Sequence, residues 1–393
     1  MRLSWDANVR LMYLWRALTM MHFFTGALVP FFTDWGGLTL PQLFLLQAWF
    51  FLWIFLLEIP TGAVSDYLGR KESLVCASVC LTAATALYAT GKGLPRYLLA
   101  EFVWAAAAAF SSGSDEAMVY DSLRAAGREK DSKAALARLA TFDIGAIACA
   151  APVGSLIAAR WGLRAPMFAM LVPFSLGIVA SLFLREPPAD AGEEKRGYLE
   201  TMTRGVRYFR AHKALRALAF DSVTVWMLSF MTVWLFQPRL KELGWGVERY
   251  GFVTAAMTLG QIMLLNNAER AERLLGGPRG FLRWSAVIPG VAFLGLALAR
   301  HPLLAAGLFV LTTGFGMSRS VLIGNHLNKH VDSARRATVL SSVGMARQLM
   351  GVIVLPAVGL LTKASLSWTF AALGAAVLVC SSLSAVQEEH LAA

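Results

Sequence analysis

The chain has 393 residues, of which 57% are hydrophobic and only 16% are charged, and its formal net charge is +11 at pH 7. Its mean hydropathy is +0.56. A soluble chain of this length intersperses its charges, whereas this chain places them between apolar runs long enough to cross a hydrocarbon core about 30 Å thick. The composition therefore predicts an all-α integral membrane protein and excludes a soluble, nucleic-acid-binding module.

Twelve apolar stretches follow one another along the chain. Each is near the length of about 20 residues that a bilayer-spanning helix requires. The stretches lie at 11–33, 40–64, 72–91, 95–121, 139–159, 164–184, 215–237, 249–267, 281–299, 302–324, 337–362 and 366–386. We expect one transmembrane helix for each stretch.

The distribution of Lys and Arg predicts how these helices are oriented. With the N-terminus in the cytoplasm, basic residues gather in the inner loops 124–138, 185–216 and 270–283, and far fewer fall outside. The positive-inside rule then predicts a multi-pass protein of the cytoplasmic (inner) membrane with both termini in the cytoplasm. The net positive charge belongs to a collar that faces the lipid head groups, so no nucleic-acid partner is expected.

One long polar connection divides the spans six and six. It predicts an N-terminal half at 1–184, a cytoplasmic linker at 185–214 and a C-terminal half at 215–393. Pro187 and Pro188 end the sixth helix because proline lacks a backbone donor. The stretch 198–210 combines apolar and basic residues and is expected to form an amphipathic helix on the inner leaflet.

Motifs for enzymatic chemistry are absent from the sequence. It contains no G-x-x-x-x-G-K-[ST] phosphate loop, no H-E-x-x-H and no G-x-S-x-G. The four cysteines lie inside apolar runs and lack zinc-site spacing. We expect no enzymatic activity, no cofactor and no metal site.

The loop between the second and third spans carries the most specific motif. Gly62, Asp66, Gly69, Arg70 and Lys71 stand at the spacing G-x-x-x-D-x-x-G-R-K. This pattern, at this junction of a twelve-span chain with a central linker, resembles the signature of the major facilitator superfamily. The resemblance covers nearly the whole chain and implies two pseudo-symmetric six-helix halves that work by alternating access.

The resemblance also implies a gating role for this loop. Asp66 is expected to meet the positive end of the eleventh-helix dipole near residue 337. Arg70 is expected to pair with Asp121 at the inner end of the fourth helix. Gly62 and Gly69 allow close helix approach and a tight turn. Together with Lys71, these residues would form a latch that is closed while the cytoplasmic side is closed.

Ionisable residues inside the predicted spans are costly in lipid and are the candidates for solute binding or proton coupling. The candidates are Arg16, His22, Glu58, Asp115, Glu116, Asp143, Asp221, Arg319 and Arg347. A further carboxylate, Glu101, lies near the outer end of its helix and is expected to reach water.

By their distance from the helix ends, Arg16, Glu58, Asp115 and Asp143 fall in the inner half of the membrane and are candidates for one network. Two roles for the candidate residues stay open at the level of sequence. One role is structural, in which Arg16 with Glu58, or Asp115 with Arg319, form neutralised ion pairs. The other is that one carboxylate loses its partner in one state and takes up a proton, with Asp115 or Glu116 ahead of Asp143.

The sequence therefore predicts a secondary transporter that moves a small organic solute, with proton-coupled export as the first hypothesis. Proton- or ion-coupled uptake of a nutrient or metal chelate is the alternative within transport, and a membrane receptor or structural protein is the alternative outside it. The expected partners are a small-molecule substrate, protons and the lipid bilayer, and the expected state is a monomer.

Overall fold

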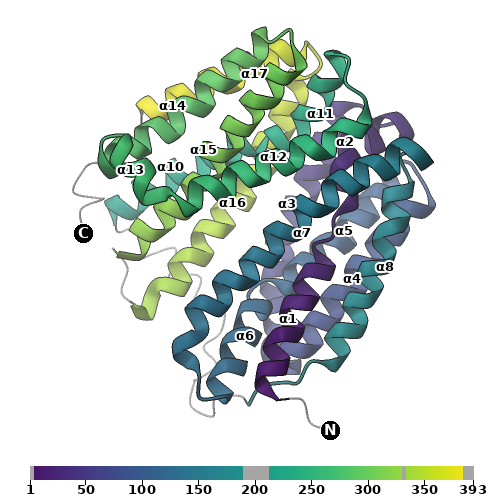
Figure 1. Cartoon of the computed structure of the whole chain (residues 1–393), viewed down its shortest axis with the longest axis vertical. Helices are drawn as coiled ribbons and strands as arrows, with labels where there is room; N and C mark the ends of the chain where they lie inside the picture. The colour runs from purple at the N-terminus through teal and green to yellow at the C-terminus, as the bar shows by residue number, and fades with distance from the viewer. Residues whose placement is uncertain (1–3, 189–211, 330–332, 384–393) are drawn as a thin grey trace. The chain divides into compact units, whose positions relative to one another are not determined.

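A computed structural model of the chain describes residues 4–188, 212–329 and 333–383, within which there are helices and no strand (Figure 1). Side chains are described in these ranges except at 59, 63, 66, 213–219 and 320–341. The prediction of an all-α fold is confirmed for this part of the chain. The chain divides into two compact units.

Unit 1 consists of Met1–Leu38, Trp49–Tyr198 and Val247–Phe252. Its elements in chain order are α1 (Trp5–Thr19), η1 (Phe23–Ala27), α2 (Leu28–Pro30), η2 (Phe31–Trp35), most of α3 (Leu40–Leu68), α4 (Arg70–Thr90), α5 (Leu94–Ser111), α6 (Ser114–Ala125), η3 (Glu129–Asp131), α7 (Ser132–Trp161) and α8 (Ala165–Phe183). Within the unit, α4 packs on α5 and α8, and α1 packs on α6, α7 and α8.

Unit 2 consists of Thr39–Ala48, Leu199–Gly246 and Val253–Ala393. Its elements are α10 (Lys213–Phe230), α11 (Thr232–Glu242), most of α12 (Val247–Asn266), α13 (Ala268–Leu274), α14 (Gly277–Leu298), α15 (Pro302–Lys329), α16 (Ser333–Leu361) and α17 (Leu366–Ser382). The helices α14 and α17 pack side by side, and α10 packs on α15, α16 and α17 (Figure 1).

Three predicted spans are interrupted rather than continuous. The first consists of α1, a turn, the 3₁₀ helix η1, α2 and the π-helix η2. The fourth is divided into α5 and α6 at Gly113, and the seventh into α10 and α11 at Met231. At Gly113 the backbone takes φ +73°, which glycine adopts without the steric penalty that a side chain brings. Pro30 cannot donate a backbone hydrogen bond, and it lies where α2 changes into η2.

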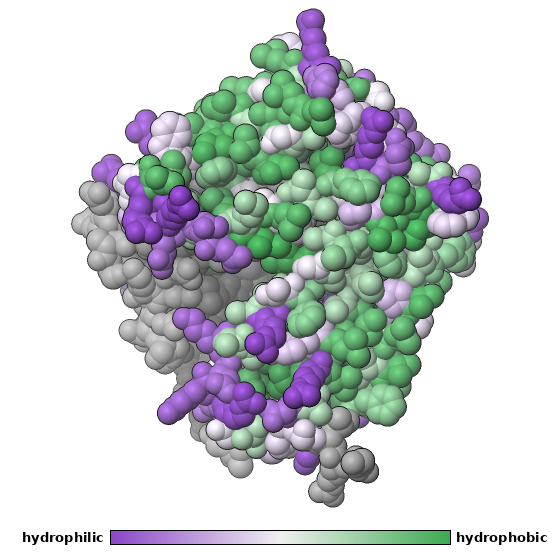
Figure 2. Space-filling model, in the orientation of Figure 1, coloured by the Kyte–Doolittle hydropathy of each residue, from purple (hydrophilic) through white to green (hydrophobic). Residues whose placement is uncertain are grey.

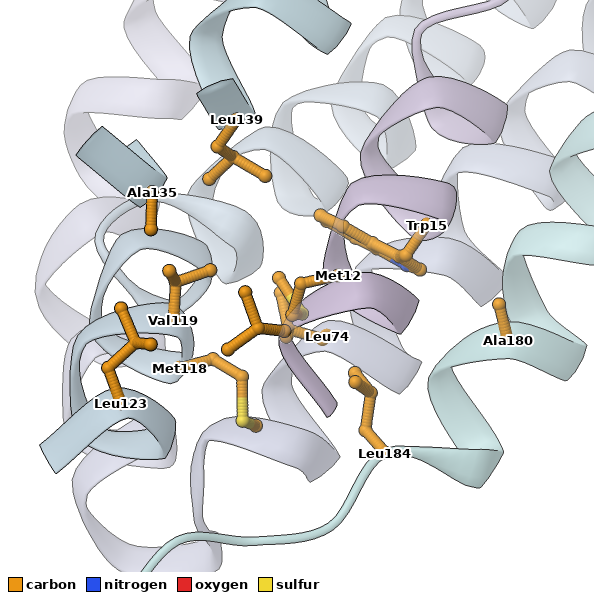
Figure 3. Close-up of a cluster of buried hydrophobic side chains, with 11 residues drawn as sticks. Met12, Trp15, Leu74, Met118, Val119, Leu123, Ala135, Leu139, Ala180 and Leu184 are labelled. Atoms are coloured by element: carbon orange, nitrogen blue, oxygen red, sulfur yellow. The ribbon is translucent and has the colours of Figure 1, made fainter. Parts of the chain in front are cut away.

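The core of unit 1 joins five helices through one apolar cluster (Figure 3). Met12 and Trp15 of α1 lie against Leu74 of α4, and Met118 of α6 lies beside them. Trp15 also donates its indole Nε1–H to the Ser78 hydroxyl at 2.8 Å, so its one polar atom is satisfied in the core. The cluster fixes α1 and α6, the two helices that carry most of the candidate charges of this unit.

The outer face of α8 is apolar although it is exposed. Phe168, Val172, Leu176, Val179 and Phe183 follow one helix face and all are exposed, while the opposite face is buried in unit 1. Figure 2 shows hydrophobic residues in broad continuous areas on the visible face, separated by clusters of hydrophilic residues. An exposed apolar stripe of this length is expected where the solvent is lipid.

Six helices of the described chain are long and apolar enough to cross a membrane by length and composition alone. They are Leu40–Glu58, Arg70–Thr90, Glu129–Trp161, Ala165–Phe183, Gly277–Leu298 and Ser342–Leu361. A further apolar helix, Leu366–Ser382, is shorter. The first, fourth and seventh predicted spans are absent from this set because each is broken into shorter helices.

Two helices divide between the units. The first turns of α3 pack on α16 in unit 2, where a Cβ on Gly359 would lie 2.7 Å from the Phe44 Cβ. The first turns of α12 pack on α7 in unit 1, where a Cβ on Gly251 would lie 2.0 Å from the Ala151 carbonyl oxygen. Only glycine permits such backbone approach. The division at 184 and 215 stays a prediction, and the amphipathic helix expected at 198–210 lies outside the described residues.

We expect Gly154→Ala to destabilise the protein. A Cβ at Gly154 would lie 1.6 Å from the carbonyl oxygen of Phe23, so the alanine must separate η1 from α7. The cost expected for such overpacking is about 1–3 kcal/mol. The measurement is thermal unfolding of the purified protein in detergent. Gly145→Ala on the same helix is the control, because a Cβ there meets nothing within 4 Å. Equal unfolding midpoints for the two variants would contradict the close approach of η1 to α7 at Gly154.

Candidate functional site

A cavity of about 320 Å³ lies inside unit 1. Its lining comes from α1, the turn after α1, α4, α5 and the start of α6. The lining residues are Trp15, Arg16, Thr19, Met20, His22, Ala77, Leu81, Trp104, Ala107, Ala108, Ser111, Ser112 and Asp115. The wall is mostly apolar, and a few polar groups converge on it, as is typical of small-molecule sites.

Arg16 is bound by two carboxylates at once. Its Nη1 donates to Asp115 Oδ2 at 2.9 Å, and its Nη2 donates to Asp143 Oδ2 at 3.2 Å. The three side chains come from α1, α6 and α7. With one positive and two negative formal charges, the cluster carries an excess of one negative charge when both acids are ionised. We call these three residues the Arg16 cluster.

The break in the fourth span places Asp115 in this cluster. Gly113 turns the backbone so that α6 begins at Ser114, and Asp115 stands in the first turn. Its Oδ1 accepts the backbone N–H of Glu116 at 2.8 Å, and the helix N-terminus favours a negative charge there. A continuous helix across 95–121 would have had no such terminus at membrane depth.

His22 lies in the turn between α1 and η1 and is surrounded by aromatic rings. Its ring centroid is 5.7 Å from that of Trp104, 5.6 Å from Phe24 and 5.8 Å from Phe174. Its Nε2 is buried and has no hydrogen-bond partner within the described residues. A buried ring nitrogen without a partner at a cavity wall is available to a bound solute.

Glu58 and Glu116 take part in no ion pair among residues 4–188. Glu116 is exposed at the start of α6, and Glu58 is half-buried in α3. The structure therefore brings Arg16, Asp115 and Asp143 together and leaves the other two acids outside the Arg16 cluster.

Unit 2 contains a fully buried ion pair. Arg319 of α15 donates to Asp221 of α10, with an Nε to Oδ2 distance of 3.0 Å and a second bond from Nη2. Its Nη1 donates to the Ser285 hydroxyl at 2.6 Å and to the Leu282 carbonyl of α14. The two charged side chains are 3% and 2% exposed, so the pair is closed to solvent.

Arg347 of α16 lies over the ring of Trp226 in the same unit, with its Cζ 4.6 Å from the ring centroid. Its Nε is buried and has no hydrogen-bond partner in the part of the chain that the structure describes. Of the three candidates in unit 2, Arg347 therefore differs from Asp221 and Arg319 in having no opposite charge beside it among the described residues.

The observed pairs differ from those that the sequence suggested. Of the acids grouped with Arg16, Asp115 and Asp143 bind it and Glu58 does not, and Arg319 binds Asp221 instead of Asp115. Counting residues along helices gave the depth of each charge but not the helix face on which it lies.

Glu101 is a second correction. It is 6% exposed and therefore does not reach water as expected, and its carboxylate interacts with Tyr88. Tyr97 lies on the same helix, and its ring packs near that of Tyr88 at 5.6 Å. The signal that sequence reasoning missed was these tyrosines, which place polar hydroxyls within an otherwise apolar region.

The comparisons with known proteins agree on a family. A model described as Major Facilitator Superfamily matches residues 14–356. The chain belongs to the major facilitator superfamily. The resemblance expected from the loop signature is thereby confirmed. No curated protein matches the sequence.

Solved transporter structures share the fold at low sequence identity. The nucleoside transporter NupG is 13% identical with a TM-score of 0.79, over 96% of this chain and 98% of that chain. A bacterial homologue of the human lysosomal transporter Spinster is 14% identical with a TM-score of 0.74, over 100% and 96%. A POT family transporter in complex with a thioalcohol-conjugated peptide is 12% identical with a TM-score of 0.73, over 95% and 94%. These structures share the fold, and the family model over residues 14–356 identifies the chain as a membrane transporter of the major facilitator type and not an enzyme.

The loop signature of this major facilitator transporter is arranged around Gly69. Gly69 has φ +108°, and α4 begins at the next residue. Arg70 forms an ion pair with Asp121 and donates from Nη1 to the Ala117 carbonyl at 2.9 Å. The pairing of Arg70 with Asp121 matches the expectation from sequence. Its role as a latch stays a prediction.

The other signature residues have less distinctive surroundings. Gly62 lies inside α3, and Lys71 lies in the first turn of α4. Asp66 also lies in α3, but its side chain is outside the described part of the chain. The eleventh helix, α16, begins at Ser333, four residues before the expected start, and its side chains up to 341 are likewise not described.

Glu186 completes the loop in a way that the sequence did not predict. Its Oε1 accepts the backbone N–H of Arg70 at 2.9 Å, and its Oε2 accepts that of Lys71 at 2.7 Å. A carboxylate thereby caps the first turn of α4, where helix N–H groups lack partners. The neighbouring Arg185 is also held, since its backbone N–H donates to Asn8 Oδ1 at 2.9 Å. The first residues after α8 are thus attached to α1 and α4.

No group of three or more His, Cys, Asp or Glu side chains within residues 4–188, 212–329 and 333–383 is arranged to hold a metal ion.

We expect Arg319→Met to destabilise the transporter strongly. The substitution leaves Asp221 buried without its cation, a defect that costs about 3–5 kcal/mol. Combining it with Asp221→Leu removes both charges and is expected to restore most of the loss. SDS titration and thermal unfolding in detergent measure both variants. A double variant as unstable as the single one would contradict this account.

An exposed ion pair provides the control for that experiment. Arg128 binds Asp131 and Asp6 on the surface of unit 1, and the hydrogen bond and charge of Asp131, followed by those of Asp6, raise its pKa. Because water solvates all three groups, Arg128→Met is expected to leave the unfolding midpoint nearly unchanged.

We expect Glu186→Ala to destabilise unit 1 by about 0.5–2 kcal/mol, the cost of losing a helix cap. The measurement is hydrogen exchange at the backbone amides of Arg70 and Lys71, which should become faster, together with the unfolding midpoint. Glu269→Ala, at an exposed site in the first turn of α13, is the control. Unchanged exchange at both amides would rule out the cap.

Proposed function

We propose that this transporter exports a small organic solute by alternating access and exchanges it for protons. The observation that carries the proposal is the Arg16 cluster at the cavity of unit 1, where one guanidinium is shared by Asp115 and Asp143. Two carboxylates beside one cation cannot both be neutralised by it. One proton taken up by the pair removes the excess charge.

The environments of the two acids support a proton that belongs to the pair. Burial opposes the ionised form of Asp115, while Arg16, the N–H of Glu116 and the start of α6 favour it. Asp143 is more exposed and has one described donor at 3.2 Å. A solute that competes for Arg16 would change the proton affinity of both acids, which is the linkage that coupled transport requires.

The cavity lining supports a solute with an apolar or aromatic part. Trp15 and Trp104 provide ring surface, and His22 offers an unpaired nitrogen beside them. The nucleoside transporter and the peptide-bound POT family transporter that share the fold act on different solutes, so the cargo is proposed from the lining alone.

The setting of the proposal is the cytoplasmic membrane, with both termini in the cytoplasm and the protein working as a monomer. The excess of Lys and Arg in the inner loops supports this orientation. In it, the Arg70–Asp121 pair and the Glu186 cap lie at the cytoplasmic ends of their helices, where we propose that they act as a gate latch.

We expect Asp115→Asn and Asp143→Asn each to abolish uphill transport driven by a pH gradient while sparing solute counterflow. The reason is that exchange of solute for solute needs the cavity but no net proton movement. The measurement is flux in proteoliposomes with and without a pH gradient. Asp131→Asn, a carboxylate on the surface outside the cavity, is the control.

The direction of proton movement distinguishes the alternatives in the same assay. Protons moving opposite to the solute support export by antiport, and protons moving with it would support uptake instead. Normal uphill transport by both Asn variants would overturn proton coupling at the Arg16 cluster.

A further inference from the structure

The helices α10 and α16 of unit 2 face each other along a narrow seam. Val223 of α10 packs on Val343 of α16, and Met350 extends this contact. Trp226 stands three residues after Val223, and Arg347 stands four residues after Val343. Because residues three and four apart share a helix face, Trp226 and Arg347 form the next contact of the same seam. The Arg347 Cζ lies 4.6 Å from the centroid of the Trp226 ring, which agrees with this placement.

The side chains at this contact are partly exposed, unlike those around it on α10. Of the α10 residues from Asp221 to Phe230, only Trp226 and Phe230 are not buried. Their rings are stacked, with centroids 5.0 Å apart and an interplanar angle of 9°. Arg347 is also only partly buried. The accessible part of this stretch of α10 is therefore an aromatic pair with a guanidinium lying on it.

Among the described residues, the guanidinium of Arg347 has no acceptor for its N–H groups. An aromatic ring attracts a cation but accepts none of its five N–H groups as a carboxylate would. No described carboxylate forms an ion pair with Arg347, and its Nε is buried without a partner among the described residues. Arg319 in the same unit is different, because it has Asp221, Ser285 and the Leu282 carbonyl.

Lipid is an unsuitable neighbour for this face. A guanidinium within a membrane span is costly against hydrocarbon and is found facing water, an anion or a binding cavity. The planar fork of arginine matches the two oxygens of a carboxylate or phosphate. The missing partner therefore has the chemistry of an oxyanion.

We propose that Arg347, held over the ring of Trp226, binds the anionic group of the transported solute, and that the solute is an organic anion with an apolar body. The oxyanion, a carboxylate or a phosphate ester, takes the free N–H groups of Arg347. The Trp226–Phe230 pair provides the surface against which the apolar body packs. The inference rests on the proposed function for its transport role, and it assigns that function a substrate class.

The first test is binding to the full-length protein purified in detergent, measured by titration calorimetry. The probes are benzoate and phenyl phosphate, with benzylammonium and benzyl alcohol as cationic and neutral matches. We expect the two anions to bind in preference to the other two probes. Arg347→Gln should weaken anion binding at least about tenfold, as expected for one charge-assisted contact, while Arg347→Lys should retain part of it.

A matched control removes a different arginine from an aromatic ring. Arg160 lies over Trp161 at 5.9 Å at the exposed end of α7. Arg160→Gln should leave anion binding unchanged. If it weakens binding as much as Arg347→Gln does, or if neither anion binds the unmodified protein at millimolar concentration, the proposal is overturned.

The second test needs no variant and therefore does not depend on its folding. Phenylglyoxal modifies accessible arginines, and mass spectrometry measures the rate at each site. Arg347 should react, Arg319 should be protected by Asp221, and benzoate should slow the reaction at Arg347 by several-fold. Equal rates at Arg347 with and without benzoate would overturn the proposal.

A lipid head group is the other source of an oxyanion, and nanodiscs distinguish it. Protection of Arg347 by phosphatidylglycerol, with no protection by benzoate or phenyl phosphate in phosphatidylcholine nanodiscs, would assign the site to lipid and overturn a solute site. These measurements need no flux, so a failure here is distinguishable from a failure of proton-coupled transport.

Discussion

One guanidinium shared by two carboxylates is the interaction on which the arrangement of unit 1 depends. Arg16 joins α1, α6 and α7 within predicted membrane spans, where each charge needs an opposite charge or a strong donor. Arg16 holds the cluster together. Because the acids outnumber the cation, one negative charge is left uncompensated when both acids are ionised. The closed Asp221–Arg319 pair of unit 2 has no such excess. We therefore propose that the Arg16 cluster takes part in proton coupling and that the Asp221–Arg319 pair has a structural role.

The interruptions of the helices explain how a polar site exists inside an apolar unit. A continuous helix satisfies its own backbone and presents only side chains, whereas a broken one presents helix ends. Gly113 creates the helix start that holds Asp115, and the turn after α1 places His22 at the cavity wall. Both features lie in predicted spans that are broken into helices too short to count among the long apolar helices.

The sequence predicted the class of fold and the family because both can be recognised from local properties of the chain. Span length, hydropathy and the motif around Gly69 need no knowledge of neighbours, and the Arg70–Asp121 pair followed from the motif. The sequence grouped Arg16 with Glu58, Asp115 and Asp143. Which of these acids bind Arg16, and which acid binds Arg319, did not follow, because pairing depends on helix rotation as well as depth. Glu101 was misplaced for the same reason, and the Glu186 cap required contact between segments more than a hundred residues apart.

The Glu186 cap gives the central linker a fixed starting point. The carboxylate that closes the first turn of α4 directly precedes Pro187 and Pro188, so the chain after α8 is attached to the signature loop up to this point. A change at Glu186 therefore acts first on the helix start that carries Arg70. How firmly the loop between α3 and α4 is held thus depends on a residue more than a hundred positions further along the chain.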